Sequence, residues 1–424
     1  MKISVLTLGC KVNQYESGAI AKHLLELGHE TTETLSPADI YIINTCAVTN
    51  DAEKKSRQLI TKCLKQNKDG KIIVMGCATQ NKTENFQTKH NVLYMIGNAK
   101  KEMAISEVEK IQREQIEKSN AKSAEKVEET FSLPKHYEEE FASSTHKTRA
   151  FIKVQDGCNN FCSYCIIPYL RGRSRSRSLQ SVSSEISQLQ DVHEVVLVGI
   201  DLSDYESGLE NLALETNKHG VRFRFGSLEA SVITEKLLSA LKSCENFCPQ
   251  FHLSLQAGDD ETLFAMNRKY TTAEYFEKVQ LIREHFENSS ITTDIIVGFP
   301  TETKSQFEIS MQFAKKVEFA DIHVFPYSVR SGTLASKKYQ DMPAEFKNER
   351  KDKMLEVKSQ LIHNYLNAHI GKTVEVLLEE QHGEYFVGHS REFIKCYIKG
   401  VKSNQIVKVV VEKAYKDGVI CTVQ

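Results

Sequence analysis

The sequence has no excess of charge of either sign, and it contains no long apolar segment. Its 55 Lys and Arg residues balance 56 Asp and Glu residues, which excludes a uniformly basic nucleic-acid coat but leaves room for a local basic patch. No apolar run approaches the roughly 18 residues that a membrane span needs, so we expect no membrane partner. The start, MKISVLTLGC, runs directly into strand-like sequence, and we therefore expect no cleavable signal peptide.

The cysteine pattern is not that of a secreted disulfide scaffold. The chain has 11 cysteines, an odd number, spread over 424 residues rather than packed into a small domain. This usage predicts a cytoplasmic protein with reduced thiols, some of which bind metal.

Residues 1–100 alternate short apolar runs with helical stretches. Buried parallel strands are expected at Ile3–Leu8, Ile40–Ile43 and Ile72–Met75, with helices between them. This βαβ pattern predicts a doubly wound α/β domain. Residues 101–146 are expected to form a helix followed by a polar linker, because residues 101–141 hold 11 acidic and 7 basic residues and few apolar ones after Ile116.

Residues 147–343 return to α/β alternation. The six expected strands are Phe151–Val154, Val195–Val198, Arg222–Phe225, Phe251–Leu255, Ile291–Val297 and Ile322–Phe325. Six units predict a partial (β/α)6 barrel, whose chemistry would lie on the loops after the strands.

The last two segments differ from the barrel in character. Residues 344–370 are expected to form a charged helical connector. Residues 371–424 contain five short strands separated by turn residues, which predicts a small antiparallel β-barrel of a type that often binds oligonucleotides.

Three cysteines each lie just past the carboxyl end of a predicted parallel strand. Cys10 follows ISVLTLG, Cys46 follows DIYIINT, and Cys77 follows KIIVMG. Because the carboxyl ends of parallel strands form one edge of a sheet, we expect these thiols to converge. They are suited to an iron–sulfur cluster or to zinc, and three ligands would leave one position open.

A second trio lies in the loop DGCNNFCSYCIIPYLRGRSRSR after the first barrel strand. Cys158, Cys162 and Cys165 have the spacing CxxxCxxC, which is compact enough to hold one cluster and leave one iron without a protein ligand. A zinc knuckle would require a fourth Cys or His nearby, and none follows.

The CxxxCxxC spacing on a βα barrel resembles the radical S-adenosylmethionine (SAM) family. The motifs LGCKVNQYES, INTCAVTNDAEKKSRQ, VMGC, HLSLQAGDDETLFAMNRKYT, TTDIIVGFPTET and HVFPYSVRSGTLA further resemble its methylthiotransferase subfamily. The resemblance implies a cluster domain, a radical SAM barrel and a C-terminal TRAM domain. It also implies SAM and two [4Fe–4S] clusters: an auxiliary cluster on the first trio, and on the second trio a cluster whose open iron binds SAM. Ala78, Thr301 and Ala230 depart from the subfamily pattern.

CKVNQYES and HVFPYSVRSGT are most similar to the branch that acts on N6-threonylcarbamoyladenosine in tRNA. The resemblance implies radical insertion of a methylthio group at C2 of the modified adenosine just 3′ of the anticodon, in two SAM-dependent steps. It also implies an electron donor of low potential, such as flavodoxin or ferredoxin, and a sulfur source. The alternatives are an isopentenyladenosine-tRNA enzyme and a ribosomal-protein aspartate enzyme. In a different class, the chain would be an iron–sulfur RNA-binding or redox-sensing module.

Further site residues are expected beside the clusters. The resemblance places Tyr164 beside the adenine of SAM. Other SAM contacts are expected near the ends of later barrel strands, at Gly199, Glu229, Gln256, Arg268, Gly298 and Phe325. Residues 147–177 carry a net charge of +6, and phosphate contacts are expected from Arg171, Arg173, Arg175 and Arg177. We predict no catalytic residues beyond the cluster ligands. The other cysteines, Cys63, Cys244, Cys248, Cys396 and Cys421, are interpreted as structural thiols.

Overall fold

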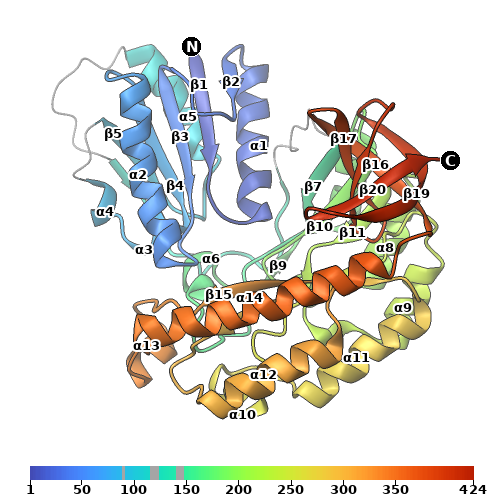
Figure 1. Ribbon diagram of the computed structural model, residues 1–424. Coiled ribbons are helices and arrows are strands. Elements are labelled where there is room, and N and C mark those ends of the chain that lie inside the picture. Colours follow the sequence, from blue (N-terminus) through green and yellow to red (C-terminus); the bar gives the residue numbers. More distant parts are fainter. Residues whose placement is uncertain (88–90, 115–123, 140–147) are drawn as a thin grey trace. The chain divides into compact units, whose positions relative to one another are not determined.

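The computed structural model describes residues 1–87, 91–114, 124–139 and 148–424 (Figure 1). The chain forms two compact units. The first comprises Met1–Ser144, Phe151–Ser178 and Ser328–Thr333, and the second comprises Thr145–Ala150, Leu179–Tyr327 and Leu334–Gln424. The loop with the second cysteine trio, which we assigned to the barrel domain, thus belongs to the first unit. The division into five domains stays a prediction.

A six-stranded parallel sheet forms the centre of the first unit (Figure 1). Its strand order is β2–β1–β3–β4–β5–β6, and every residue of β3 is buried, as expected of a strand covered on both faces. The strands are β1 (Lys2–Thr7), β2 (Glu30–Thr32), β3 (Ile40–Thr45), β4 (Lys71–Gly76), β5 (Val92–Ile96) and β6 (Ala124–Lys126).

Helices cover both faces of this sheet. Ile20 of α1 packs with Ile40 and Ile42 on one face, whereas Ile60 of α2 packs with Ile43 on the other. The doubly wound domain is therefore confirmed. The helices of the first unit are α1 (Lys11–Glu26), α2 (Asn50–Gln66), α3 (Cys77–Asn81), α4 (Glu84–Gln87), α5 (Met103–Glu114) and, in the loop with the second cysteine trio, α6 (Ile167–Arg171). The predicted linker differs in part, because β6 extends the sheet; residues 115–123 and 140–147 lie outside the described residues.

All six predicted barrel strands are present. They are β7 (Arg149–Lys153), β10 (Glu194–Val198), β11 (Arg222–Phe225), β13 (Gln250–Leu253), β14 (Ser290–Val297) and β15 (Asp321–Pro326). These strands form two sheets, with the strand orders β11–β10–β7 and β12–β13–β14–β15, in which the short strand β12 (Ser227–Leu228) was not predicted. Only Arg149 and Ala150 of β7 belong to the second unit. The pairings of β10 with β11 and of β12 through β15 are parallel, as predicted.

Helices follow the strands of the second unit. Two of them begin with capping boxes, at Thr271 and Thr303, in which a threonine hydroxyl and the side chain three residues later satisfy backbone N–H groups of the first turn. The α-helices are α7 (Leu179–Ser187), α8 (Leu209–Asn217), α9 (Glu235–Lys242), α10 (Asp260–Ala265), α11 (Thr272–His285), α12 (Lys304–Val317) and α13 (Leu334–Lys338), and the short 3-10 turns are η1 (Leu202–Asp204) and η2 (Ala230–Val232).

Two further short strands, β8 (Gln155–Asp156) and β9 (Arg175–Ser176), belong to the first unit and pair with each other.

The long helix α14 (Ala344–Asn367) leads into a closed five-stranded barrel (Figure 1). The predicted small five-stranded β-barrel is thus confirmed, but it is not purely antiparallel, because β18 pairs with β20 in parallel and closes the barrel. Alternate strand residues such as Val376 and Leu378 fill its interior together with Cys396 and Cys421, which are buried as expected. Its strands are β16 (Thr373–His382), β17 (Tyr385–Ser390), β18 (Lys395–Ile398), β19 (Gln405–Tyr415) and β20 (Gly418–Val423).

Candidate active site

The first cysteine trio lies at the carboxyl edge of the first unit's sheet. Strands β1, β3 and β4 are neighbours, with Thr7 paired to Asn44 and Thr45 paired to Gly76. The three strands therefore end side by side at the same edge of the sheet. Cys10 is the N-cap of α1, Cys46 follows β3 directly, and Cys77 begins α3. Electrostatic coupling links Cys10 with Cys77, and Cys46 with both. The structure thus brings the three thiols together.

Glycines before two of these cysteines allow the close approach. Gly9 and Gly76 have φ values of +103° and +101°, a region that L side chains rarely adopt. A Cβ atom on Gly9 would lie 2.8 Å from Cβ of Cys46 and 2.9 Å from its Sγ. Only glycine therefore lets the Cys10 turn pack against Cys46.

Buried polar side chains hold the three strand ends in register. Asn13 donates from Nδ2 to the carbonyl oxygens of Leu8 (2.8 Å) and Thr45 (3.0 Å). Asn44 donates to the carbonyl of Asn13 (3.0 Å), and the Thr45 hydroxyl donates to the carbonyl of Met75 (2.7 Å). Because these bonds join backbone that precedes or follows all three cysteines, the trio is preorganised.

The thiols of the first trio lie in a poorly solvated environment. Although Cys10 is solvent-accessible, desolvation by the surrounding protein raises the pKa of its thiol, and the Arg171 guanidinium opposes that rise. Burial raises the pKa of Cys46 to about 11. Binding iron must displace these protons, and three soft, converging sulfur donors beside a buried cation fit an anionic iron–sulfur cluster.

Arg171 is the centre of a buried ion network in the first unit. Its side chain is 1% exposed, and its Nη1 lies 2.9 Å from both Glu16 Oε1 and Asp156 Oδ1. Its Nη2 donates to Asn13 Oδ1 (2.7 Å), while Lys153 also contacts both carboxylates. Burial opposes ionisation of Glu16 and Asp156, but Arg171 and the lysines outweigh it and lower both pKa values. The network ties α1 and its N-terminal Cys10 to the loop that carries the second trio.

The second trio lies in a loop that is closed at its base. The paired strands β8 and β9 join Asp156 to Arg175, and the N–H of Cys158 donates to the carbonyl of Gly172 (3.2 Å). Gly157, with φ +72°, touches the backbone of Arg173 so closely that a Cβ there would lie 2.0 Å from its carbonyl oxygen. This glycine therefore allows the base of the loop to close.

Within the loop the three cysteines are partly exposed. The N–H of Asn160 donates to Cys158 Sγ (3.4 Å), and the N–H of Cys165 donates to the carbonyl of Cys162 (3.0 Å). A backbone donor to sulfur and three partly accessible thiols in one short loop fit a cluster with one iron left open. Tyr164 is partly buried between the second and third cysteines.

The four arginines predicted to bind phosphate differ in their surroundings. Arg171 is held in the buried network, and Arg177 is 3% exposed and donates to the carbonyl of Lys153 (2.9 Å). Neither has a free surface for a phosphate, because both act as internal counterions or donors. Arg175 is partly buried against Asp156 (3.1 Å), whereas Arg173 is exposed and stacks on Phe161. We therefore keep the RNA prediction chiefly for Arg173.

The predicted SAM contacts of the second unit lie at or near strand ends. Glu229 and Arg268 form an ion pair of 2.8 Å, so the carboxylate that Arg268 binds in this structure is that of Glu229. Gln256 has φ +71°, and a Cβ on Gly298 would lie 2.5 Å from the Lys347 side chain. A side chain at position 298 would therefore collide with α14, and the lack of one allows this part of the chain to pack against that helix. Phe325 is 43% exposed at the end of β15, and Gly199 follows β10 in a partly buried position.

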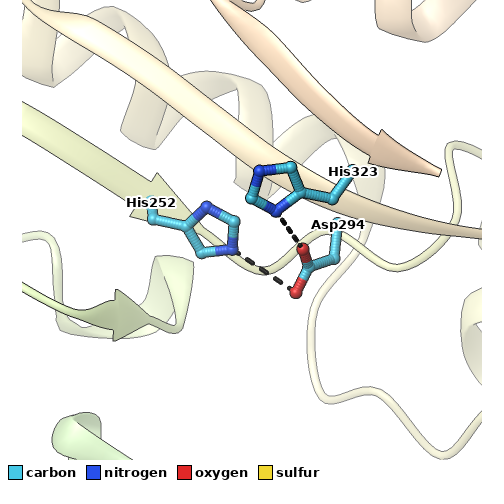
Figure 2. Close-up of side chains that lie close together, drawn as sticks. All are labelled: His252, Asp294 and His323. Atoms are coloured by element: carbon cyan, nitrogen blue, oxygen red, sulfur yellow. Dashed lines mark hydrogen bonds and ion pairs between the residues drawn. The ribbon is translucent and has the colours of Figure 1, made fainter. Parts of the chain in front are cut away.

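Sequence reasoning missed one cluster of polar side chains in the second unit. His252 on β13, Asp294 on β14 and His323 on β15 lie side by side (Figure 2). The signal was available, because a charged or imidazole side chain interrupts three successive predicted strands. Reasoning from the cysteines also missed Glu16, Asn13 and Asp156, which are buried and only become neighbours through the fold.

Two family profiles match the chain. The Radical SAM superfamily matches residues 152–314, and a group described as Uncharacterized protein family UPF0004 matches residues 2–97. The threonylcarbamoyladenosine tRNA methylthiotransferase MtaB of Bacillus subtilis is 35% identical, covering 97% of this chain and 94% of the relative, and that of Chlamydia pneumoniae is 36% identical over 98% and 96%. The chain belongs to the radical SAM methylthiotransferase family. This methylthiotransferase is therefore a radical SAM enzyme, and its family implies a [4Fe–4S] cluster and SAM as cofactors.

The fold of the methylthiotransferase also has solved neighbours. One is the radical SAM methyltransferase TsrM from Kitasatospora setae, with a TM-score of 0.58 and 13% identity over 79% of this chain and 77% of that one. Another is the cobalamin-dependent SAM radical enzyme OxsB, with a TM-score of 0.52 and 13% identity over 85% of this chain and 56% of that one. Among the described residues, no helix has the length and apolar character needed to cross a membrane.

Proposed function

We propose that this methylthiotransferase acts on tRNA and inserts a methylthio group at C2 of N6-threonylcarbamoyladenosine just 3′ of the anticodon. Five relatives named for this substrate are 33–36% identical to the chain. Three relatives named tRNA-2-methylthio-N(6)-dimethylallyladenosine synthase are 33–35% identical, and they support the isopentenyl substrate as the second candidate. We also keep the prediction of a cytoplasmic enzyme.

The observation that carries the proposed reaction is the presence of two cysteine trios in the first unit, whereas the choice of nucleoside rests on the relatives. Each trio offers three thiols, which suits a four-iron cluster with one open iron. We assign the auxiliary cluster to Cys10, Cys46 and Cys77, and the radical SAM cluster to Cys158, Cys162 and Cys165. Two clusters separate the handling of sulfur from the cleavage of SAM.

When bound, the second cluster and SAM supply the radical chemistry that an unreactive aromatic C–H bond requires. The protein supplies position and charge. The Asn13 hydrogen bonds fix the strand ends that bear the first trio, and Arg171 places one positive charge beside those thiolates while its ion pairs hold the second loop. Both trios therefore depend on the same buried network.

The remaining partners follow from the reaction. The exposed guanidinium of Arg173, which stacks on Phe161 beside the second trio, is our candidate for contact with an RNA phosphate. An electron donor of low potential, such as flavodoxin or ferredoxin, and a sulfur source are needed to complete the cycle.

Nucleoside mass spectrometry of tRNA tests this proposal. A strain that lacks the gene should lose 2-methylthio-N6-threonylcarbamoyladenosine, and the wild-type gene should restore it. A gene with Cys158, Cys162 and Cys165 replaced by Ala is the matched negative control. Unchanged levels of that nucleoside together with loss of the 2-methylthio-isopentenyl nucleoside would establish the second candidate instead.

A further inference from the structure

The cluster of His252, Asp294 and His323 occupies one face of three adjacent parallel strands. Asp294 is paired directly with His323, and His252 is paired with Thr292, two residues before Asp294. Because strand residues two apart point to the same side, the three side chains share a face. On β14 the opposite face is closed, since Ile291, Thr293, Ile295 and Val297 are buried, whereas Asp294 is only partly so.

Hydrogen bonds define the arrangement within the cluster. Asp294 Oδ1 lies 3.1 Å from His323 Nδ1, and Asp294 Oδ2 lies 3.4 Å from His252 Nε2 (Figure 2). The other ring nitrogen of His252, Nδ1, lies 2.9 Å from the Thr292 hydroxyl. Each carboxylate oxygen of Asp294 thus faces its own imidazole.

His323 is the member of the cluster that can reach a ligand. Its side chain is 51% exposed, compared with 11% for His252 and 26% for Asp294. Its Nε2 lies 3.8 Å from Asp321 Oδ2, which is beyond hydrogen-bond distance, and Lys358 pairs with the other oxygen of Asp321 at 2.9 Å. The hydrogen bond that Nδ1 of His323 donates to Asp294 raises the pKa of His323, which favours a protonated ring whose second N–H, on Nε2, is not hydrogen-bonded to Asp321.

The cluster also lies on the strands that lead to the predicted cofactor contacts. His252 precedes Gln256 by four residues, Asp294 precedes Gly298 by four, and His323 precedes Phe325 by two. At about 3.3 Å per strand residue, a ligand group some 7–13 Å from those predicted contacts would meet the cluster. This separation suits a substituent on a nucleoside whose base lies nearer those contacts.

We propose that this cluster recognises the carboxylate on the N6 substituent of the substrate nucleoside, with His323 as the binding residue and Asp294 as the positioning residue. The inference rests on the proposed function. A threonylcarbamoyl group ends in a carboxylate, whereas the isopentenyl group of the second candidate is apolar and offers nothing to a charged donor. A protonated imidazole oriented by a carboxylate therefore distinguishes the two substrates.

The geometry favours an anionic ligand over a metal ion. The donor atoms of the three residues lie within 4.8 Å of one another, and two His with one Asp would suit a transition metal. However, the two oxygens of Asp294 face different imidazoles, at 3.1 Å and 3.4 Å, so in this arrangement the carboxylate bridges the two rings and already engages one nitrogen of each (Figure 2).

The test compares three synthetic anticodon stem-loop RNAs with the reconstituted full-length enzyme, SAM and dithionite. One RNA carries N6-threonylcarbamoyladenosine, the second carries its carboxyl methyl ester, and the third carries isopentenyladenosine. We expect the wild-type enzyme to prefer the acid over the ester in kcat/KM by roughly 10- to 100-fold, the range of one hydrogen bond between charged groups.

Four variants probe the residues. His323→Leu should abolish the preference for the acid, and His323→Lys, which keeps a cationic donor, should retain part of it. Asp294→Asn should raise KM for the acid with a smaller change in kcat, as expected if it acts by orienting His323. His363→Leu is the matched control, since His363 is exposed on α14 and pairs with Asn367, and it should keep the full preference.

The outcomes separate this inference from the proposed function. A wild-type enzyme that modifies the isopentenyl RNA but not the threonylcarbamoyl RNA overturns both. An enzyme that modifies the threonylcarbamoyl RNA while His323→Leu still prefers the acid overturns the inference alone. A bound metal other than iron at about one equivalent in the wild type, lost in His323→Leu, also overturns it. If His323→Leu is inactive on every RNA, the inference stands only if His323→Lys prefers the acid, and it falls if that variant does not.

Discussion

Replacing Arg171 with Gln tests whether this arginine serves the fold rather than the RNA. The substitution leaves Glu16 and Asp156 buried without their shared guanidinium, and removing one partner of a buried ion pair costs about 3–5 kcal/mol. Lys153 still contacts both carboxylates, at 3.2 Å and 3.3 Å, so we expect the lower end, about 3 kcal/mol. For a unit of this size that loss lowers Tm by roughly 6–12 °C.

The assay is differential scanning calorimetry of metal-free protein, with Arg173→Gln as the matched control. Arg173 belongs to the same run of arginines but is exposed, so its loss should change stability by no more than about 1 kcal/mol. In turn, Arg173→Gln should weaken tRNA binding and reduce the salt slope by about one, as expected for one lost phosphate contact. Equal Tm values for the two variants, together with weaker tRNA binding by Arg171→Gln than by Arg173→Gln, would refute the structural role of Arg171 in the buried network.

Three further predictions concern other parts of the molecule. Burial opposes ionisation of the Glu194 carboxyl, but Arg224 and Arg149 outweigh burial and lower the pKa of Glu194 from 4.5 to about 2. The ion pairs of Glu194 therefore stabilise the fold above pH 4.5, and this stability is lost as the pH falls through 2. Glu194→Gln should therefore cost about 3 kcal/mol at pH 7 in urea unfolding, and a difference from wild type that does not shrink between pH 4.5 and 2 would contradict this. Gly9→Ala should reduce the iron held by the first trio, because the new methyl group would meet Cys46; full iron content would disprove the crowding. Cys244→Ser with Cys248→Ser should leave the iron content unchanged, and a loss of iron would make these two cysteines ligands.

Much of the fold was predictable because local patterns determine it. The apolar runs that end in Cys10, Cys46 and Cys77 indicate parallel strands, and the shared edge of such strands explains why the thiols converge. Five short strands separated by turn residues in the last 54 residues predicted the small barrel, although not the parallel pairing of β18 with β20. Strands β2, β5 and β6 were not predicted. β2 and β6 have only three residues each, which carry no periodic signal, whereas the apolar run VLYMI of β5 was overlooked.

The charged groups were less predictable, because their partners are remote in sequence. Arg171 meets Glu16 across 155 positions, and no spacing rule connects them. A run of arginines was therefore read as a surface patch, although two of its members are buried. The cluster of His252, Asp294 and His323 is an intermediate case. The strands were predicted, but the alignment of their polar positions depends on the register between them.

The most direct test of the central assignment is the iron content of anaerobically reconstituted protein and of two triple variants. The wild type should bind about eight iron atoms per chain if each trio holds a four-iron cluster. Replacing Cys10, Cys46 and Cys77 with Ala should leave about four iron atoms and preserve SAM cleavage while methylthiolation stops. Replacing Cys158, Cys162 and Cys165 should also leave about four iron atoms but abolish cleavage. Loss of cleavage in the first variant, or an unchanged iron content in either, would contradict the division of labour between the two trios.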